Sequence, residues 1–240
     1  MAARVALVGF GTGGAVFHAP LITSVPGLRL EAVVTGNPER AEAARGRYPG
    51  TRVLDSADRL WETPEDYDLV VITAPNRHHV PLARTALTSG LPVVLDKPVA
   101  ASADEARSLA ALAAVRGLPV IPFHNRRWDG DFRTVRRLVE GGALGTVLRF
   151  ESRFERWRPE VRPGWKESTD PLDAGGILFD LGTHLIDQAI TLFGRPHRVY
   201  AEIGTRRPGA AVPDDVFLAL THDGDVRSHL WMSATAAQFG

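Results

Sequence analysis

The chain has 240 residues, and its 28 Lys and Arg balance its 28 Asp and Glu, so no global charge draws it to nucleic acid or an anionic membrane surface. It contains no cysteine, which excludes disulfides and thiolate metal sites. Without an apolar run of about 18 residues, and with an N-terminus that enters a strand directly, we expect no transmembrane helix and no signal peptide, and hence a cytoplasmic protein.

A glycine-rich turn follows the first apolar run. Val5 to Val8 is wholly apolar, as a parallel strand buried on both faces should be. Gly9 to Gly14 then has the GxGxxG spacing, whose glycines permit a tight turn, a close approach to a pyrophosphate and close helix packing. A helix is expected from Ala15 to Thr23, kinked or restarted near Pro20, with His18 as a surface or capping residue. We predict a dinucleotide-binding turn; the alternative is a purely structural one.

The residues after the second strand, Leu30 to Val34, bear on the choice of dinucleotide. NAD enzymes usually place Asp or Glu there to bond the ribose 2′-hydroxyl. Small polar residues stand there instead, and Arg40 follows them. An arginine suits a 2′-phosphate, so we predict NADP, with NAD still possible. The alternative is that Asn37 and Pro38 only cap the next helix.

Strands and helices alternate up to residue 123, which predicts a doubly wound parallel sheet. Further strands are expected at 52–54, 68–73, 92–95 and 118–123, and helices at 39–48, 58–61, 78–89 and 103–116. Ligands of such sheets bind beyond the carboxyl ends of the strands. Lys97 lies at one such end, between an acid and a proline, so we predict a site role for it. Residues 1–123 are thus expected to form a dinucleotide-binding Rossmann domain.

The pattern changes from residue 124 onward. Strands are expected at 147–154, 199–205, 216–221 and 226–235, the last two joined through Asp223-Gly224, and a long helix at 174–193. Residues 124–240 are therefore predicted to form an α+β domain with a mainly antiparallel sheet, for substrate binding and oligomerisation. The strands at 216–221 and 226–235 carry apolar residues on both faces. One face of the sheet should cover the long helix. The other face needs a partner, so we predict a homodimer or homotetramer that associates through the sheet.

The long helix carries a narrow polar stripe of Asp180, His184 and Asp187. The helix is otherwise so apolar that this stripe is expected to face a cleft, although a solvated stripe is the alternative. An imidazole titrates near neutrality and can take a proton from a hydroxyl, and a carboxylate one turn away can orient it. A catalytic zinc is the poorer interpretation, because no third ligand accompanies these residues at a usual spacing.

Together these motifs resemble the Gfo/Idh/MocA family of nicotinamide-dependent oxidoreductases. The matching features are Gly9-x-Gly11-x-x-Gly14, Ala74-Pro75-Asn76-x-x-His79, Asp96-Lys97-Pro98 (Glu-Lys-Pro in the family), Asn125-Arg126-Arg127-Trp128-Asp129 and Gly175-Gly176-x-x-x-Asp180-x-Gly182-x-His184-x-x-Asp187. Phe17-His18-Ala19-Pro20 and the segments around His124 and His184 look like its NADP-dependent scyllo-inositol dehydrogenases.

The resemblance implies hydride transfer between a secondary alcohol of a polyol or sugar and C4 of the nicotinamide. It implies catalytic roles for Lys97, Asp180 and His184: Lys97 polarises the substrate oxygen, His184 is the general acid/base, and Asp180 holds substrate. The expected cofactor-binding residues are Gly9, Phe10, Gly11, Thr12, Gly13, Gly14, Thr35, Gly36, Asn37, Arg40, Thr73, Pro75, Asn76, His79, Asp96, Lys97 and Trp165. The expected substrate-binding residues are Lys97, Asn125, Arg127, Asp180 and His184.

Two departures leave alternatives open. Lys166 stands where the family has an arginine that reaches over the cofactor, and family members usually continue well beyond this length. A non-catalytic nicotinamide-dinucleotide sensor, or an inactive truncated relative, is therefore the alternative function, and an oxidation-assisted elimination on a glycoside is a third. Arg127, Arg153, Arg158 and Arg162 are either surface residues or contacts for a charged substrate. The main expectation is that Lys97 and His184 converge on one crevice.

Overall fold

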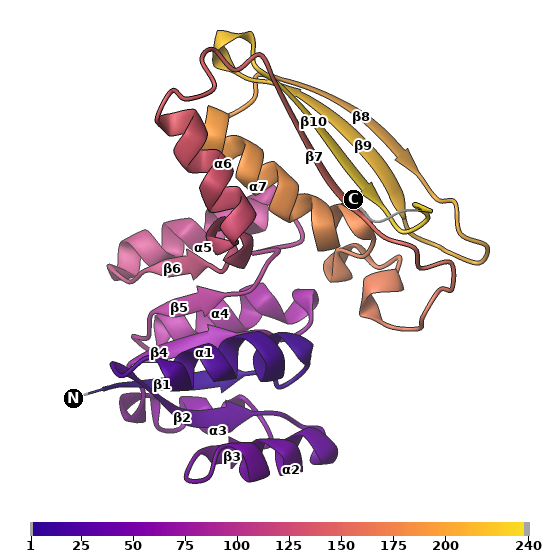
Figure 1. Ribbon diagram of the computed structural model, residues 1–240. Coiled ribbons are helices and arrows are strands. Elements are labelled where there is room, and N and C mark those ends of the chain that lie inside the picture. The colour runs from indigo at the N-terminus through magenta and orange to yellow at the C-terminus, as the bar shows by residue number, and fades with distance from the viewer. Residues whose placement is uncertain (1, 238–240) are drawn as a thin grey trace. The chain divides into compact units, whose positions relative to one another are not determined.

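A computed structural model describes residues 2–237 of the chain (Figure 1). Contacts between Cα atoms divide the chain into two compact units, Met1–Phe123 and His124–Gly240. Within the described residues, no helix has both the length and the apolar character that crossing a membrane requires.

The N-terminal unit is built on a six-stranded sheet in which all neighbouring strands run parallel. Its order is β3-β2-β1-β4-β5-β6, as in doubly wound nucleotide-binding folds. The strands are β1 (Ala3–Val8), β2 (Leu28–Val34), β3 (Arg52–Leu54), β4 (Leu69–Ile72), β5 (Val93–Leu95) and β6 (Val120–Pro122). The predicted fold class of this half is confirmed.

The helices of this unit fall close to their predicted positions. They are α1 (Ala19–Ser24), α2 (Pro38–Arg47), α3 (Asp58–Trp61), α4 (His79–Thr88) and α5 (Ala103–Arg116). Helix α5 matches its predicted bounds because both of its ends are encoded locally. The Ser102 hydroxyl accepts the Glu105 N–H at 3.2 Å, and Gly117 ends the helix at φ +65°.

Residues Val5 to Val8 of strand β1 are all apolar because both faces of the strand are buried there. Ala6 and Val8 point into one hydrophobic core, and Val5 and Leu7 point into another on the opposite side of the sheet. Alternate side chains of a strand point to opposite faces, so burial on both sides leaves no position for a polar residue.

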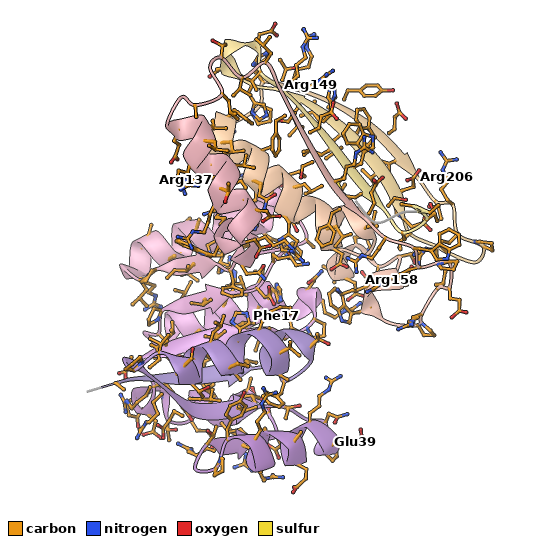
Figure 2. The ribbon with its side chains drawn as sticks, in the orientation of Figure 1. Phe17, Glu39, Arg137, Arg149, Arg158 and Arg206 are labelled. Carbon is orange, nitrogen blue, oxygen red and sulfur yellow. The ribbon has the colours of Figure 1, made fainter. Side chains whose placement is uncertain are left out.

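The segment after the glycine turn is a π-helix, η1 (Gly13–His18), which runs into α1 (Ala19–Ser24). The predicted restart near Pro20 is therefore present. The expectation for His18 as a surface or capping residue is wrong: its ring is 3% exposed and packs on Phe123, with ring centroids 4.1 Å apart. Phe17, labelled in Figure 2, is instead 46% exposed. The wider π turn changes which residue faces inward, and a 3.6-residue period does not anticipate it.

The C-terminal unit contains a four-stranded sheet of order β7-β10-β9-β8. Its strands are β7 (Arg149–Glu155), β8 (Arg198–Gly204), β9 (Asp215–Thr221) and β10 (Arg227–Ser233). The β8–β9 and β9–β10 pairs are antiparallel, whereas β10 and β7 run parallel. The sheet is thus mainly antiparallel, as predicted, with one parallel edge strand.

Two helices, α6 (Gly130–Glu140) and α7 (Thr183–Phe193), belong to this unit, and α7 packs on β7 and β10 (Figure 1). Leu181, Leu185 and Ala189 lie against Leu230 and Met232 in its buried core. Alternate residues of β9 and β10 are buried, so one face of the sheet covers α7 as predicted.

The predicted start of the long helix at Ala174 is wrong. Helical structure begins with a second π-helix, η7 (Leu178–Gly182), which continues into α7. Ala174 and Gly176 have φ values of +46° and +92°, which no right-handed helix accommodates. The Asp180 end of the polar stripe therefore lies on π-helical backbone.

Candidate functional site

The glycine turn is packed against backbone at two of its glycines and against side chains at the other two. A Cβ on Gly9, which has φ +100°, would lie 2.9 Å from Thr73, and a Cβ on Gly14 would lie 2.1 Å from the Gly9 oxygen. The Thr73 hydroxyl donates to that same oxygen at 2.9 Å. Gly11 and Gly13 meet only side-chain atoms at such a position. Backbone therefore closes the turn at Gly9 and Gly14, whereas over Gly11 and Gly13 the turn meets the side chains of Arg40, Asp96 and Thr73.

Arg40 lies beside Gly11. Its Nη1 lies 3.7 Å from a Cβ built on Gly11. Asn37 caps α2, because its side chain accepts the Arg40 N–H at 2.9 Å, and the Asn37 N–H in turn reaches the Thr35 hydroxyl at 3.4 Å. Asn37 is thus the N-cap of α2, and the same cap fixes the start of the helix that carries Arg40.

His79 joins two of the strand-end segments. It is 1% exposed, and its ring nitrogens lie 2.8 Å from the Ala74 oxygen and 2.7 Å from the Pro98 oxygen. Burial lowers the pKa of His79, although the two carbonyl contacts oppose this shift. A neutral imidazole has one N–H and donates to one carbonyl at a time. His79 therefore ties the segment after β4 to the residue that follows Lys97.

Asp96 and Lys97 come directly after β5. The Asp96 Oδ1 accepts the Lys97 backbone N–H at 2.8 Å, and Oδ2 lies 3.8 Å from His18 Nε2. Burial raises the pKa of Asp96, but the His18 ring and the Lys97 N–H and ammonium outweigh it, so this pKa lies below its usual value. The same Oδ2 would lie 3.1 Å from a Cβ on Gly13. The structure thus brings Asp96 and the glycine turn together.

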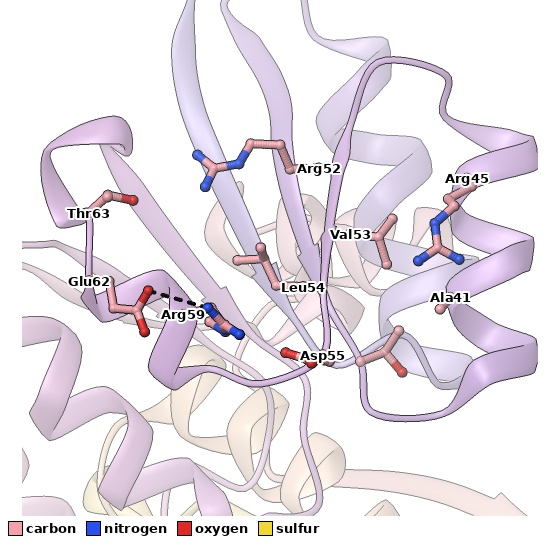
Figure 3. Close-up of a pocket in the computed structure, with 10 residues that line it drawn as sticks. Ala41, Arg45, Arg52, Val53, Leu54, Asp55, Arg59, Glu62 and Thr63 are labelled. Atoms are coloured by element: carbon pink, nitrogen blue, oxygen red, sulfur yellow. Dashed lines mark ion pairs between the residues drawn. The ribbon is translucent and has the colours of Figure 1, made fainter.

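A pocket of about 400 Å³ lies elsewhere in the N-terminal unit, around the end of β3 (Figure 3). Its lining comes from β3, α2 and α3, and Arg59 and Glu62 pair across 3.8 Å within it. Thr35 is the one predicted cofactor residue in its lining. This pocket is therefore distinct from the glycine turn and from Lys97.

In the C-terminal unit, Asp180 and His184 lie on the continuous η7–α7 segment. His184 is 6% exposed, and its ring centroid is 6.4 Å from that of Phe154 on β7. Lys166 Nζ donates to Asp180 Oδ1 at 2.7 Å. The lysine that differs from the family pattern thus holds a predicted catalytic carboxylate.

The loop that carries Trp165 and Lys166 is anchored at two points. Gly176 donates its N–H to the Lys166 oxygen at 2.8 Å, and a Cβ on Gly175 would lie 2.3 Å from the Ser168 oxygen, so the paired glycines allow two backbone segments to touch. Glu167 accepts from Arg207 at 2.9 Å. The loop is thereby fixed against the start of the Asp180 helix.

Arg207 also closes a buried ion pair with Asp214. The Arg207 Nε donates to Asp214 Oδ2 at 2.8 Å, and the two side chains are 7% and 1% exposed. Burial raises the pKa of Asp214, but the backbone N–H groups of Arg206 and Arg207 and the guanidinium outweigh it, so the pKa is lowered. This ion pair holds the loop after β8 and, through Glu167, the loop of Lys166.

The predicted substrate-binding Arg127 makes a bidentate contact with Asp187, at 2.7 and 2.5 Å. His124 Nε2 lies 3.7 Å from the same carboxylate. This part of the predicted polar stripe therefore contacts the segment that contains Asn125, in the 3₁₀ turn Asn125–Trp128, rather than an open cleft.

Two arginines approach the Phe154 ring, with Arg126 at 4.5 Å and Arg156 at 5.2 Å from its centroid. Burial, followed by Arg158 and Arg126, lowers the pKa of Arg156. Sequence reasoning did not predict the contacts of Arg126 and Arg156 with Phe154, or the burial of His18 and Arg207. Only the alternation of β7 could have indicated that Phe154 faces inward.

Comparison with known proteins covers both units. Residues 3–124 match the family model described as an oxidoreductase family with an NAD-binding Rossmann fold, and residues 132–239 match the GFO/IDH/MocA C-terminal domain. The chain is 43% identical over 211 residues to the uncharacterized oxidoreductase YdgJ of Escherichia coli K12, covering 88% of this chain and 59% of YdgJ. It is 32% identical over 219 residues to the scyllo-inositol 2-dehydrogenase (NADP⁺) IolW of Bacillus subtilis 168, covering 91% of this chain and 60% of IolW.

Solved structures agree in fold. A Bacillus subtilis structure of YvaA superposes with a TM-score of 0.91 at 30% identity, over all of this chain and 67% of that one. The structure of an NAD-binding protein from Listeria innocua superposes with a TM-score of 0.90 at 26% identity, over 99% of this chain and 68% of that one. The chain therefore spans about three-fifths of the length of its curated relatives.

Proposed function

Because the chain belongs to the GFO/IDH/MocA oxidoreductase family, we propose that it binds a nicotinamide dinucleotide and transfers a hydride between its C4 and a secondary alcohol carbon. The observation that carries this proposal is the glycine turn, in which backbone and Thr73 pack against Gly9 and Gly14, while the atoms over Gly11 and Gly13 belong to side chains. A glycine turn between a buried strand and a helix is where a pyrophosphate binds.

NADP(H) is the cofactor we favour over NAD(H). Arg40 lies next to Gly11, and a guanidinium binds phosphate bidentately. The residues directly after β2 are Thr35, Gly36 and Asn37, so no carboxylate stands in the usual place to bond a ribose 2′-hydroxyl or repel a 2′-phosphate. IolW, which is NADP-dependent by name, supports the same preference. When bound, the nicotinamide supplies or accepts the hydride.

The chain's own groups would handle the substrate. Lys97 would polarise the substrate oxygen, and His184 would take or return the hydroxyl proton, because an imidazole titrates near neutral pH. Asp180, held by Lys166, would position the substrate. Positioned proton transfer of this kind is worth about 10²- to 10⁴-fold in rate.

A polyol or sugar such as an inositol is the proposed substrate class, supported by the family and by the name of IolW. We propose that residues 1–123 bind the cofactor and that residues 124–240 bind the substrate and mediate oligomerisation. The outer face of the sheet supports a homodimer or homotetramer. Phe217 and Trp231 lie on it with ring centroids 5.1 Å apart, and Tyr200 on β8 is 57% exposed.

The experiment is to follow absorbance of the reduced nicotinamide while the protein is mixed with NADP⁺ or NAD⁺ and a panel of inositols and aldoses. Turnover with one of them, reduced at least tenfold in Lys97→Ala and in His184→Ala, supports the proposal. A loss of less than tenfold in either variant shows that its role is misassigned. Dinucleotide binding with no absorbance change across the panel would favour a non-catalytic sensor instead.

A further inference from the structure

Two arginines lie on the aromatic ring beside His184. The Cζ atoms of Arg126 and Arg156 are 4.5 and 5.2 Å from the centroid of the Phe154 ring. The centroid of the His184 ring lies 6.4 Å from that of Phe154. The proposed general acid/base and two guanidinium groups therefore border one phenyl ring, all within the C-terminal unit.

Arg156 makes no ion pair with a carboxylate among residues 2–237, and its side chain is half-buried. The carboxylate that attracts it, Asp180, already accepts a hydrogen bond from Lys166 at 2.7 Å. Burial, followed by repulsion from Arg158 and Arg126, outweighs that attraction and lowers the pKa of Arg156. A half-buried charge without a close counter-charge costs free energy, and a bound anion would offset that cost.

Arg126 is only partly neutralised. Its Nη1 donates to Asp129 at 2.9 Å, but its Nε is buried and has no hydrogen-bond partner among the described residues. The side chain remains 40% exposed. A guanidinium presents its donors as a planar fork that matches the two oxygens of a carboxylate or phosphate. Arg126 therefore keeps part of its hydrogen-bonding capacity for a ligand.

Other arginines of this unit have carboxylate partners. Arg127 pairs with Asp187, and Arg153 pairs with Glu155 at 3.6 Å. These two arginines, which the sequence offered as contacts for a charged substrate, are thus already neutralised by the chain itself. The positive charge beside His184 comes instead from Arg126 and Arg156.

The backbone holds this positive charge in place. Arg156 and Arg158 follow β7 directly, and their N–H groups donate to the oxygens of Ser233 and Ala234 at 2.9 and 2.8 Å. Groups that a sheet already holds in position lose less conformational entropy when a ligand binds, so their charge contributes more to affinity.

We propose that Arg126 and Arg156 bind an oxyanion group of the substrate, so that the polyol or sugar carries a carboxylate or a phosphate. Arg158 adds to the positive potential around that group. A sugar-sized substrate with its reacting hydroxyl at His184 comes within reach of both guanidinium groups. This inference rests on the proposed function and narrows its substrate class.

The test compares anionic and neutral sugars that share one ring. Reduction of NADP⁺ by the full chain is followed by absorbance with D-glucose, D-galactose and D-mannose, and with the uronate and the 6-phosphate of each. We expect at least one anionic sugar to have a kcat/KM about tenfold or more above that of its neutral parent, because charge-assisted hydrogen bonds are the strong ones. A uronate preference identifies a carboxylate, and a 6-phosphate preference identifies a phosphate.

Three variants show whether the two arginines cause this preference. Arg126→Gln and Arg156→Gln should each lower kcat/KM for the preferred anionic sugar about tenfold or more, mainly through KM, and change that of its neutral parent much less. A merely structural role would lower both alike. Arg149→Gln is the matched control, because it removes an exposed arginine at the other end of β7, where it pairs with Glu151 at 3.3 Å. It should alter neither value. If Arg156→Gln does not fold, as judged by circular dichroism, Arg126→Gln carries the same decision.

The two possible failures are distinguishable. Turnover of neutral sugars or inositols without a preference for any anionic sugar, or equal losses for anionic and neutral sugars in the variants, overturns this inference and leaves the proposed function standing. Dinucleotide binding without turnover of any inositol, aldose or anionic sugar overturns both.

Discussion

A single methyl group on Gly14 should disable dinucleotide binding. In Gly14→Ala the new Cβ would lie 2.1 Å from the Gly9 oxygen and 3.0 Å from the Thr73 hydroxyl. Carbon contacts are most favourable at about 3.5–4.0 Å, so the turn must open by more than about 1 Å. Because the clashing atom is backbone, a side-chain rotation cannot relieve it.

The cost follows from this displacement. Overpacking of a close-packed site costs about 1–3 kcal/mol, and a backbone clash belongs at the upper end of that range. If the new methyl group destabilises the pyrophosphate-binding conformation of the turn by about 2–3 kcal/mol, the dissociation constant for NADPH rises by about 30- to 150-fold. Gly13→Ala should lose less, since its 3.1 Å neighbour is the movable side chain of Asp96.

The assay is calorimetric titration with NADPH, with circular dichroism to show that each variant is folded. Gly27→Ala is the control, because a Cβ there would meet no atom within 4 Å among residues 2–237, its chain neighbours aside. A folded Gly14→Ala protein that binds NADPH as tightly as the unaltered chain would refute the placement of the dinucleotide on this turn. An equal loss in Gly27→Ala would show that the effect is not local.

Three further predictions concern charge and association. Arg40→Gln should weaken NADPH binding by about tenfold or more, because it removes a charged hydrogen bond worth about 1.5–3 kcal/mol, and it should leave NADH binding almost unchanged. The control Arg107→Gln, at an exposed side chain, should alter the binding of neither dinucleotide. Equal losses for both dinucleotides in calorimetry would contradict the assignment of Arg40 to the 2′-phosphate. Asp214→Asn should destabilise the protein by about 3–5 kcal/mol at pH 7, since it breaks a buried ion pair. The pKa of Asp214 is lower in the folded state than in the unfolded state, where it is about 3.9, so the stability that the ionised carboxylate contributes is full above about pH 4 and is lost as the pH falls through the folded-state pKa. In urea unfolding, the loss of stability in Asp214→Asn should therefore shrink below about pH 4. A loss that is independent of pH would refute the charge argument. Trp231→Glu should lower the molar mass found by light scattering, while Leu144→Glu, 57% exposed on a turn, should not; an unchanged mass for Trp231→Glu would count against association through the sheet.

Local signals in the sequence predicted most elements of the fold. Strand β1 and helix α5 were predictable because an apolar run marks a strand buried on both faces, and because a serine cap and a terminal glycine mark the ends of a helix. The strand ends also indicated Thr73 and Asp96, which the structure brings to the glycine turn. Arg40 lies beside Gly11, and its role toward a 2′-phosphate stays a prediction.

What the sequence did not predict depends on contacts between distant residues. The burial of His18 requires Phe123, more than a hundred residues away, and the parallel pairing of β7 requires a strand near the end of the described chain. Both π-helices were missed because a 3.6-residue period was assumed throughout. Lys166 proved to bond Asp180, a contact that no local pattern specifies.

The most direct test of the central claim uses reduced NADP carrying deuterium at C4. The protein is incubated with each C4 epimer of this NADPD and with a panel of inososes and other keto and aldo sugars, and the polyol products are analysed by mass spectrometry. We predict that one epimer transfers one deuterium to the carbinol carbon of a product, and that Lys97→Ala and His184→Ala reduce the labelled product at least tenfold. Tight NADPH binding with no deuterium in any product would contradict the account.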